Sequence, residues 1–149
     1  MRVLSIDPGL ATGMCCFTME PGKEPVLEWS AELDEDTFIQ PIRWEIANHP
    51  DIRIVCERFT ITQETAKKSQ APFSLEQIGN LKQAMRDAGL PVSDIALQAP
   101  RDAKAMFPNP ALKKLGYWHK GGAGHALDSI RHGLLYLARN GWKPTRLLD

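Results

Sequence analysis

Three short apolar segments that resemble strands follow one another at the start of the chain, and this order constrains the fold more than any other feature. Residues 2–6 alternate in hydrophobicity, residues 13–18 form a second apolar run, and residues 26–31 follow a Pro-Gly break. Only a few turn-type residues separate the first two segments, which is typical of an antiparallel hairpin. The sequence therefore predicts three antiparallel strands at the start of a sheet.

Helix-like and strand-like segments alternate after this start. Residues 34–48 place apolar side chains at helical spacing, but Pro41 lies inside the stretch, so a helix that begins near Gln40 is the alternative. The apolar run 52–57 then ends in a carboxylate, Glu57. Such a run is typical of a buried strand.

A second helix is predicted over residues 74–88, because Ser74 and Gln77 have the spacing of a capping box and Gly89 is a C-terminal stop. The other predicted elements are a short strand at 94–98, a helix over 101–115 that Pro108 and Pro110 interrupt, a flexible glycine loop at 121–124 and a last helix over 125–139. This order predicts an α/β fold with a mixed sheet and helices on its faces.

The length of 149 residues, 43% of them apolar, predicts one compact domain over residues 1–149. The chain has no apolar run of membrane-spanning length and no signal-peptide pattern at its start, so we expect a soluble, cytoplasmic protein with no membrane association. Cys15, Cys16 and Cys56 lie in apolar runs without CxxC spacing, which predicts buried, reduced thiols.

The formal net charge is zero, which taken alone argues against a nucleic-acid partner. The charges are unevenly distributed, however. Residues 1–57 hold 4 Lys and Arg against 11 Asp and Glu, whereas residues 58–149 hold 14 against 7. The basic half either forms a binding surface or reflects chance and solvated helix faces.

Two carboxylates stand at predicted strand ends. Asp7 ends the first strand immediately before Pro8-Gly9, where a rigid turn would hold a ligand, although an aspartate that only caps the turn is the alternative. Glu57 ends an apolar strand, where a buried glutamate needs a partner or a cation. A partner such as Arg58, or a strand end that faces solvent, is the alternative interpretation.

The predicted last helix adds a second pair of polar groups. The i,i+3 spacing of His125 and Asp128 places imidazole and carboxylate on one helix face near the N-terminus, so both could reach one cation. Arg131 and His132 follow closely, and a solvated helix face is therefore the alternative. The glycine loop before His125 allows close approach and movement.

In combination, these motifs resemble the RuvC-like Holliday-junction resolvases of the RNase H-like superfamily, particularly the short bacteriophage forms. The resemblance rests on the segment 6–13, with Asp-Pro-Gly followed by Thr-Gly, on Glu57 at the end of the fourth strand, and on His125-x-x-Asp128 in the last helix. It spans nearly the whole chain. It implies an RNase H-like five-stranded mixed sheet, with three antiparallel strands and then two parallel strands, and helices on both faces.

The resemblance also implies metal-dependent cleavage of branched DNA. Asp7, Glu57, His125 and Asp128 would be both the catalytic and the metal-binding residues of a site for two Mg²⁺ or Mn²⁺ ions. Asp7 would bridge the ions, and His125 would either ligate one or assist proton transfer. Such enzymes resolve Holliday junctions during recombination or replication and work as homodimers, so that two strands are cut symmetrically. Leu75, Ile78, Leu81 and Met85 would supply either core or dimer surface.

The expected DNA contacts follow from the same resemblance. Phe59 would stack on an unpaired base. Lys104 looks like the family's phosphate-contacting lysine, and Arg101, Lys113 and Lys114 extend the basic region. The stretch 60–70 does not match the bacterial enzymes closely, so flaps and other branched DNA join four-way junctions as expected substrates.

Two other functions remain open from the sequence. One is a RuvC-related nuclease that acts on RNA, and the other is a protein that binds branched DNA without cutting it. A nucleotide-binding module of the actin-like superfamily is disfavoured, because that fold needs two duplicated domains and this chain has room for one.

Overall fold

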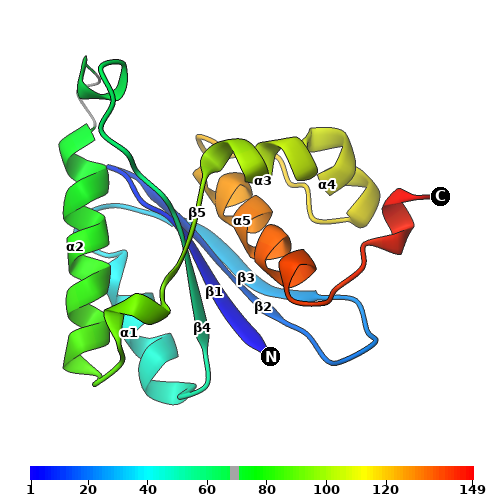
Figure 1. The fold of residues 1–149 in the computed structure, drawn as a ribbon, viewed down its shortest axis with the longest axis horizontal. Coiled ribbons are helices and arrows are strands. Elements are labelled where there is room, and N and C mark those ends of the chain that lie inside the picture. The colour runs from blue at the N-terminus through cyan, green and yellow to red at the C-terminus, as the bar shows by residue number, and fades with distance from the viewer. Residues whose placement is uncertain (68–70) are drawn as a thin grey trace.

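The structure is a computed structural model that describes residues 1–67 and 71–149, and a five-stranded mixed sheet runs through it in the order β3-β2-β1-β4-β5 (Figure 1). The pairs β1–β2 and β2–β3 are antiparallel, whereas β4 is parallel to both β1 and β5. The strands are β1 (Arg2–Asp7), β2 (Thr12–Thr18), β3 (Val26–Leu33), β4 (Arg53–Glu57) and β5 (Ala96–Gln98). The predicted arrangement of three antiparallel strands followed by two parallel strands is confirmed.

Helices cover both faces of this sheet (Figure 1). On one face lie α1 (Ile39–Asn48) and α2 (Ala71–Asp87), and on the other lie α3 (Pro100–Met106), α4 (Asn109–Leu115) and α5 (His125–Arg139). Short 3₁₀ turns span Thr65–Lys67, Val92–Asp94 and Thr145–Leu147. None of the helices in residues 1–67 and 71–149 is long and apolar enough to cross a bilayer.

The core consists of two apolar clusters, one on each side of the sheet. Successive side chains of β1 point to opposite faces of the sheet and so contribute to different clusters. Val3 belongs to the cluster under α5, whereas Leu4 and Ile6 belong to the cluster under α1 and α2. The strands β1 and β2 are buried along almost their whole length, as expected of central strands that are covered on both faces. The sheet therefore forms a rigid base for side chains at its edges.

The helix α5 lies unusually close to the sheet. Gly133 faces the ring of Phe17, and a Cβ at this position would stand 2.9 Å from two ring carbons. The hydroxyl of Ser5 donates to the carbonyl of Ser129 at 2.7 Å. Small residues on both elements thus fix the depth at which α5 packs on β1 and β2.

Several predicted boundaries need correction. The capping box was wrong: α2 begins at Ala71, so Ser74 lies inside its first turn, and the hydroxyl of Ser74 instead donates to the carbonyl of Pro8 at 3.1 Å. The first helix begins at Ile39, close to the alternative start near Gln40. Of the predicted strand 94–98 only Ala96–Gln98 is extended, because a 3₁₀ turn occupies Val92–Asp94.

Other predictions are confirmed in detail. The helix over 101–115 is broken into α3 and α4 at Phe107-Pro108, and α5 has the predicted bounds. The three cysteines are buried and form no disulfide. Of the helix residues predicted to be core or dimer surface, Leu81 and Met85 are core, Leu75 is 41% exposed, and Ile78 is partly buried.

Candidate active site

The candidate site lies at the edge of the sheet where β1 and β4 end, on the upper side of Figure 1. In the parallel ladder Ile6 pairs with Cys56, so the next residues along the two strands, Asp7 and Glu57, stand side by side. The α5 helix starts above the same edge, and its first turn contains His125 and Asp128. The fold thus gathers the four residues that the sequence predicted.

Asp7 is the most buried carboxylate of this group. It is 5% exposed, and its Oδ2 lies 3.2 Å from Nδ1 of His125. Burial is the main cause that raises the pKa of Asp7 to about 6; the nearby Glu57 and Asp128 also raise it, while the hydrogen bond with His125 lowers it. In turn, the hydrogen bond that His125 forms with the Asp7 carboxylate raises the pKa of His125 above its usual value. The protein therefore compensates the negative charge of Asp7 only in part.

Glu57 is held by a buried histidine rather than by Arg58. Its Oε2 lies 3.0 Å from Nε2 of His132, which is 1% exposed. On the other side of the ring, the amide of Gln98 lies 3.3 Å from Nδ1. The predicted alternative of an Arg58 partner was wrong, because Arg58 is exposed and its backbone N–H donates to Gln98 on β5.

Asp128 forms an ion pair with Arg131 on the same helix, at 2.7 Å between Oδ1 and Nη1. The Nε of Arg131 donates to the carbonyl of Phe107 at 2.9 Å, so this arginine also ties α5 to the end of α3. The side chain of Arg131 is 11% exposed, and His132 is buried. The alternative of a solvated helix face at Arg131 and His132 was therefore wrong.

The first turn of α5 is fixed by two residues of the antiparallel strands. Gly13 on β2 has no room for a side chain, because a Cβ would lie 2.0 Å from the carbonyl oxygen of His125. Glu32 on β3 accepts backbone N–H groups from Ala123, His125 and Ala126 at 2.8–3.2 Å. Since the residue before the helix is Gly124, which has no side chain, Glu32 satisfies amide groups that a cap residue usually satisfies.

The Asp-Pro-Gly turn has its own supports. The hydroxyl of Thr12 lies 3.3–3.4 Å from the backbone carbonyl and N–H of Gly9, and Ser74 of α2 holds the carbonyl of Pro8. These contacts give a physical reason for the Thr-Gly pair in this motif. The side chain of Thr12 bonds to the turn after Asp7, and the absence of a side chain at Gly13 leaves room for the helix that carries His125.

The donor set fits a divalent cation by its chemistry. Three carboxylates and one imidazole meet at a single edge, where burial, together with the charges of Glu57 and Asp128, raises the pKa of Asp7. As the side chains stand, each carboxylate contacts a histidine or an arginine, and within residues 1–67 and 71–149 no three acidic, histidine or cysteine side chains converge tightly enough to hold a metal ion. Binding a cation would therefore require side-chain rotation that brings oxygens of different carboxylates closer together.

The predicted DNA-contacting residues are spread over a wider surface. Phe59 lies two residues beyond Glu57 and is half-buried, while Arg101 and Lys104 are exposed on α3. On α4, the ammonium of Lys113 lies 4.6 Å from the centre of the Trp118 ring, and Lys114 donates to the carbonyls of Leu147 and Asp149. Lys113 and Lys114 thus have partners within the chain, and the DNA-binding role of all five stays a prediction.

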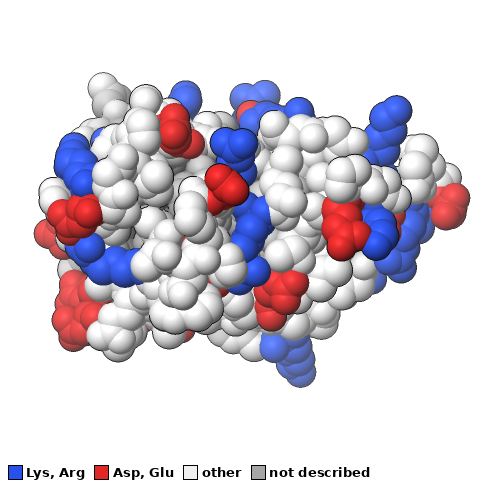
Figure 2. All heavy atoms as spheres, turned by 90° about the horizontal axis from the view of Figure 1, so that it is seen from below, with Lys and Arg blue, Asp and Glu red and all other residues white. Residues whose placement is uncertain are grey.

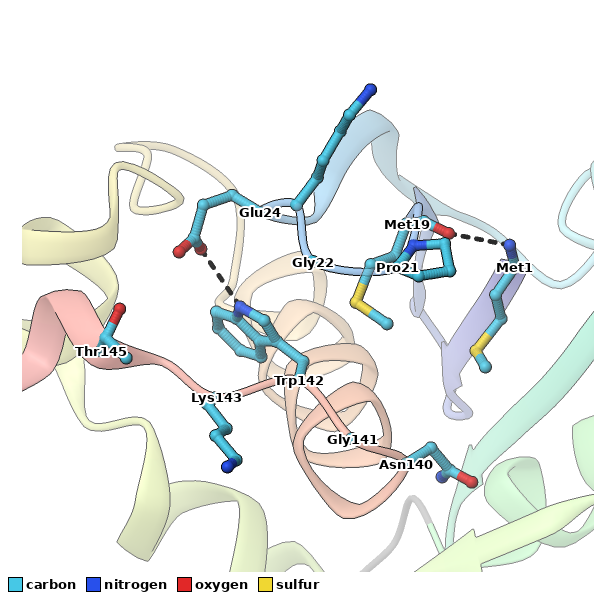
Figure 3. Close-up of a pocket in the computed structure, with 11 residues that line it drawn as sticks. Met1, Met19, Pro21, Gly22, Glu24, Asn140, Gly141, Trp142, Lys143 and Thr145 are labelled. Carbon is cyan, nitrogen blue, oxygen red and sulfur yellow. Dashed lines mark hydrogen bonds between the residues drawn. The ribbon is translucent and has the colours of Figure 1, made fainter.

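Two other regions lie away from this edge. The face seen from below in Figure 2 carries basic and acidic side chains interspersed, without a surface of one sign. A cavity of about 550 Å³ lies between the turn after β2 and the end of α5, where Trp142 donates to Glu24 at 3.2 Å (Figure 3). Met1 lines this cavity at the start of β1, at the opposite end of the strand from Asp7.

Sequence reasoning missed three residues of the site: Glu32, Gln98 and His132. Gln98 ends β5, so the rule that selected Asp7 and Glu57 at strand ends would have found it if it had included amides as well as carboxylates. His132 carried a signal in its position, because it follows Asp128 by one turn on the same helix face. Glu32 offered no such signal, since its partners lie more than 90 residues away.

Comparisons with known proteins identify the fold. No family model and no curated protein sequence matches the chain. Among solved structures, Thermus thermophilus RuvC superposes with a TM-score of 0.68 and 16% identity over 95% of this chain and 97% of RuvC. The same RuvC in complex with a Holliday junction substrate gives a TM-score of 0.66 at the same identity and coverage. A fowlpox virus Holliday junction resolvase gives 0.56 and 12% identity over 93% of this chain and 99% of the resolvase. The chain has the RNase H-like fold of RuvC over nearly its whole length.

Proposed function

We propose that this protein is a divalent-metal-dependent endonuclease that cuts Holliday junctions and other branched DNA. The observation that carries the proposal is the cluster of Asp7, Glu57 and Asp128 at one sheet edge, where burial and then the two neighbouring carboxylates raise the pKa of Asp7. The shared fold supports it, because the chain aligns over nearly all of a RuvC that was solved with a junction substrate. Fold alone does not define an activity, so the carboxylates are the stronger argument.

Asp7, Glu57, Asp128 and His125 would hold the metal. When bound, a pair of Mg²⁺ or Mn²⁺ ions supplies an activated water and stabilises the charge on the leaving oxygen during phosphodiester hydrolysis. Asp7 would turn from its contact with His125 toward the metal, and its burial between two strands limits the directions in which its oxygens can point. His125 would either ligate one ion or exchange a proton with the reacting phosphate or water.

The chain also provides a place for DNA. The segment after Glu57 carries half-buried Phe59, which would stack on an unpaired base, and exposed Arg101 and Lys104 on α3 would contact phosphates. A homodimer would place two such sites on one four-way junction, and exposed Leu75 on α2 would contribute to its interface. Sedimentation measurements on wild-type protein and Leu75→Glu test this assembly, which predicts a dimer that the variant weakens.

The experiment that tests the activity is cleavage of labelled four-way junction, flap and linear duplex DNA in Mg²⁺, Mn²⁺ or EDTA. The matched variant is Asp7→Asn, which keeps the shape of the side chain but removes its charge. We expect metal-dependent cutting of branched DNA by the wild type, and a loss of at least about 100-fold in the variant, because one carboxylate of the metal site is gone.

Matched RNA substrates complete the test. Cutting of RNA in preference to DNA would replace the proposed substrate with RNA. Tight binding of branched DNA without cleavage in any metal would indicate a binding protein, and cleavage that Asp7→Asn leaves unchanged would overturn the assignment of this edge as the active site.

A further inference from the structure

His132 is fixed in the structure from both sides of its ring. It is 1% exposed on α5, one turn after Asp128, and its Nε2 faces Oε2 of Glu57 at 3.0 Å. The side-chain amide of Gln98, itself 3% exposed, faces Nδ1 at 3.3 Å. The three side chains come from α5, β4 and β5 and form one chain of hydrogen bonds, which is buried at Gln98 and His132 and ends at Glu57, a proposed metal ligand.

The direction of each bond follows from a single contact. The Nε2 of Gln98 lies 2.8 Å from the backbone carbonyl oxygen of His132, and a carbonyl can only accept. This contact identifies the Gln98 atom near the ring as the NH₂ group, so Nδ1 of His132 must accept as well. The proton of the neutral ring then lies on Nε2, which donates to the carboxylate of Glu57.

We propose that His132 is a positioning residue for Glu57, locked by Gln98 into the tautomer that carries its proton on Nε2. This inference rests on the proposed function, because it takes Oε1 of Glu57, the oxygen that His132 does not contact, as the one that faces the metal. With Oε2 bound, the carboxylate cannot rotate freely, and Oε1 is presented for another partner at the edge where Asp7 ends β1. Partners of this kind orient metal ligands and change metal affinity by about 10- to 100-fold.

The tautomer is tested first, in metal-free protein. A long-range ¹H–¹⁵N spectrum with ¹⁵N-histidine distinguishes a proton on Nε2 from one on Nδ1. The wild type should show His132 with its proton on Nε2. In Gln98→Leu the donor to Nδ1 is lost, so the fixed tautomer should give way to a mixture. A wild-type His132 that carries its proton on Nδ1, or on both nitrogens, would overturn the inference.

The effect on the site is tested with Mn²⁺ alone, by titration calorimetry. His132→Leu removes the donor to Glu57, whereas His132→Gln keeps an N–H donor at the same distance along the side chain. We expect Mn²⁺ affinity to fall about 10- to 100-fold in His132→Leu and to recover to within about threefold of wild type in His132→Gln. In cleavage assays the loss should appear in kcat, with KM for DNA unchanged.

Three results separate the possibilities. If His132→Leu lowers only thermal stability and leaves Mn²⁺ affinity and kcat intact, His132 is merely structural and the inference fails. If His132→Gln is as defective as His132→Leu although both are folded, donation to Glu57 is not what matters, and the inference also fails. If the wild type itself binds no Mn²⁺, the proposed function fails together with the role of His132 toward the metal, while the tautomer result still stands.

Discussion

Glu32→Gln is the substitution that most directly tests how the site is held together. Glu32 lies on the edge strand β3, yet it accepts backbone N–H groups at the start of α5, two through Oε1 and one through Oε2. Glutamine has one carbonyl oxygen in place of two charged ones, and its NH₂ group would face a backbone donor. The substitution therefore removes at least one of these hydrogen bonds and all of the charge.

The magnitude follows from the role of Glu32 as a distant helix cap. Loss of a capping side chain lowers the free energy of unfolding by about 0.5–2 kcal/mol, and here the negative charge also faces the positive end of the helix dipole. The side chain is only partly buried, so we expect a loss of about 1–2 kcal/mol rather than more. For a chain of 149 residues this corresponds to a decrease in Tm of roughly 2–8 °C.

Urea unfolding at pH 7 measures this loss, and Glu28→Gln is the matched control. Glu28 lies four residues earlier on the same strand and accepts a hydrogen bond from the hydroxyl of Thr18 instead of from the start of α5. Equal effects of the two substitutions would refute the reasoning. A further check uses pH: backbone hydrogen bonds lower the pKa of Glu32, so its contribution is complete above the unfolded value of about 4.5 and disappears as the pH falls through the folded value. The difference between wild type and Glu32→Gln should shrink in that acidic window.

Three further predictions concern glycine, charge and burial. Gly13→Ala should lower the free energy of unfolding by about 3 kcal/mol or more and abolish cleavage, because the new Cβ would collide with the backbone of His125. The control is Gly79→Ala, at a helix position with open space, which should instead gain about 0.5–1 kcal/mol in urea unfolding. Asp7→Asn should stabilise the protein in EDTA at pH 8 by about 1–3 kcal/mol and have little effect near pH 4. The reason is that the pKa of Asp7 is raised to about 6, so the wild type loses stability as the pH rises through that value. No gain in urea unfolding at pH 8 would contradict this prediction. Glu45→Gln should lower the free energy of unfolding by about 2–4 kcal/mol, since buried Glu45 receives two hydrogen bonds from Arg2; a Tm equal to that of wild type would contradict this.

The order and type of the elements could be predicted from the sequence because local patterns decide them. Hydrophobic alternation identified β1, and the helical period identified α5 with its correct bounds. The prediction failed where a residue in a local sequence motif contacts a distant part of the chain instead. Ser74 and Gln77 have the spacing of a capping box, but the hydroxyl of Ser74 contacts Pro8, which is 66 residues away along the chain.

The same distinction applies to the site. Asp7 and Glu57 could be predicted because strand ends in parallel ladders meet at one edge, and neither depends on a detail of packing. Glu32 could not, because its three partners belong to a loop and a helix that only the folded sheet brings near. His132 was considered only as part of a possible solvated helix face, since nothing in the sequence fixes how far α5 rotates on the sheet.

The dependence of the sheet on α5 has a consequence for synthesis of the chain. The apolar face formed by Val3, Cys15 and Phe17 is covered by α5, whose first residue follows Asp7 by 118 positions. A nascent chain in which β1 and β2 have already paired would expose this face to other molecules until residues 125–139 emerge from the ribosome. The same delay keeps Asp7 apart from His125 and Asp128, so the partly made protein would be prone to aggregation before the proposed active site is assembled.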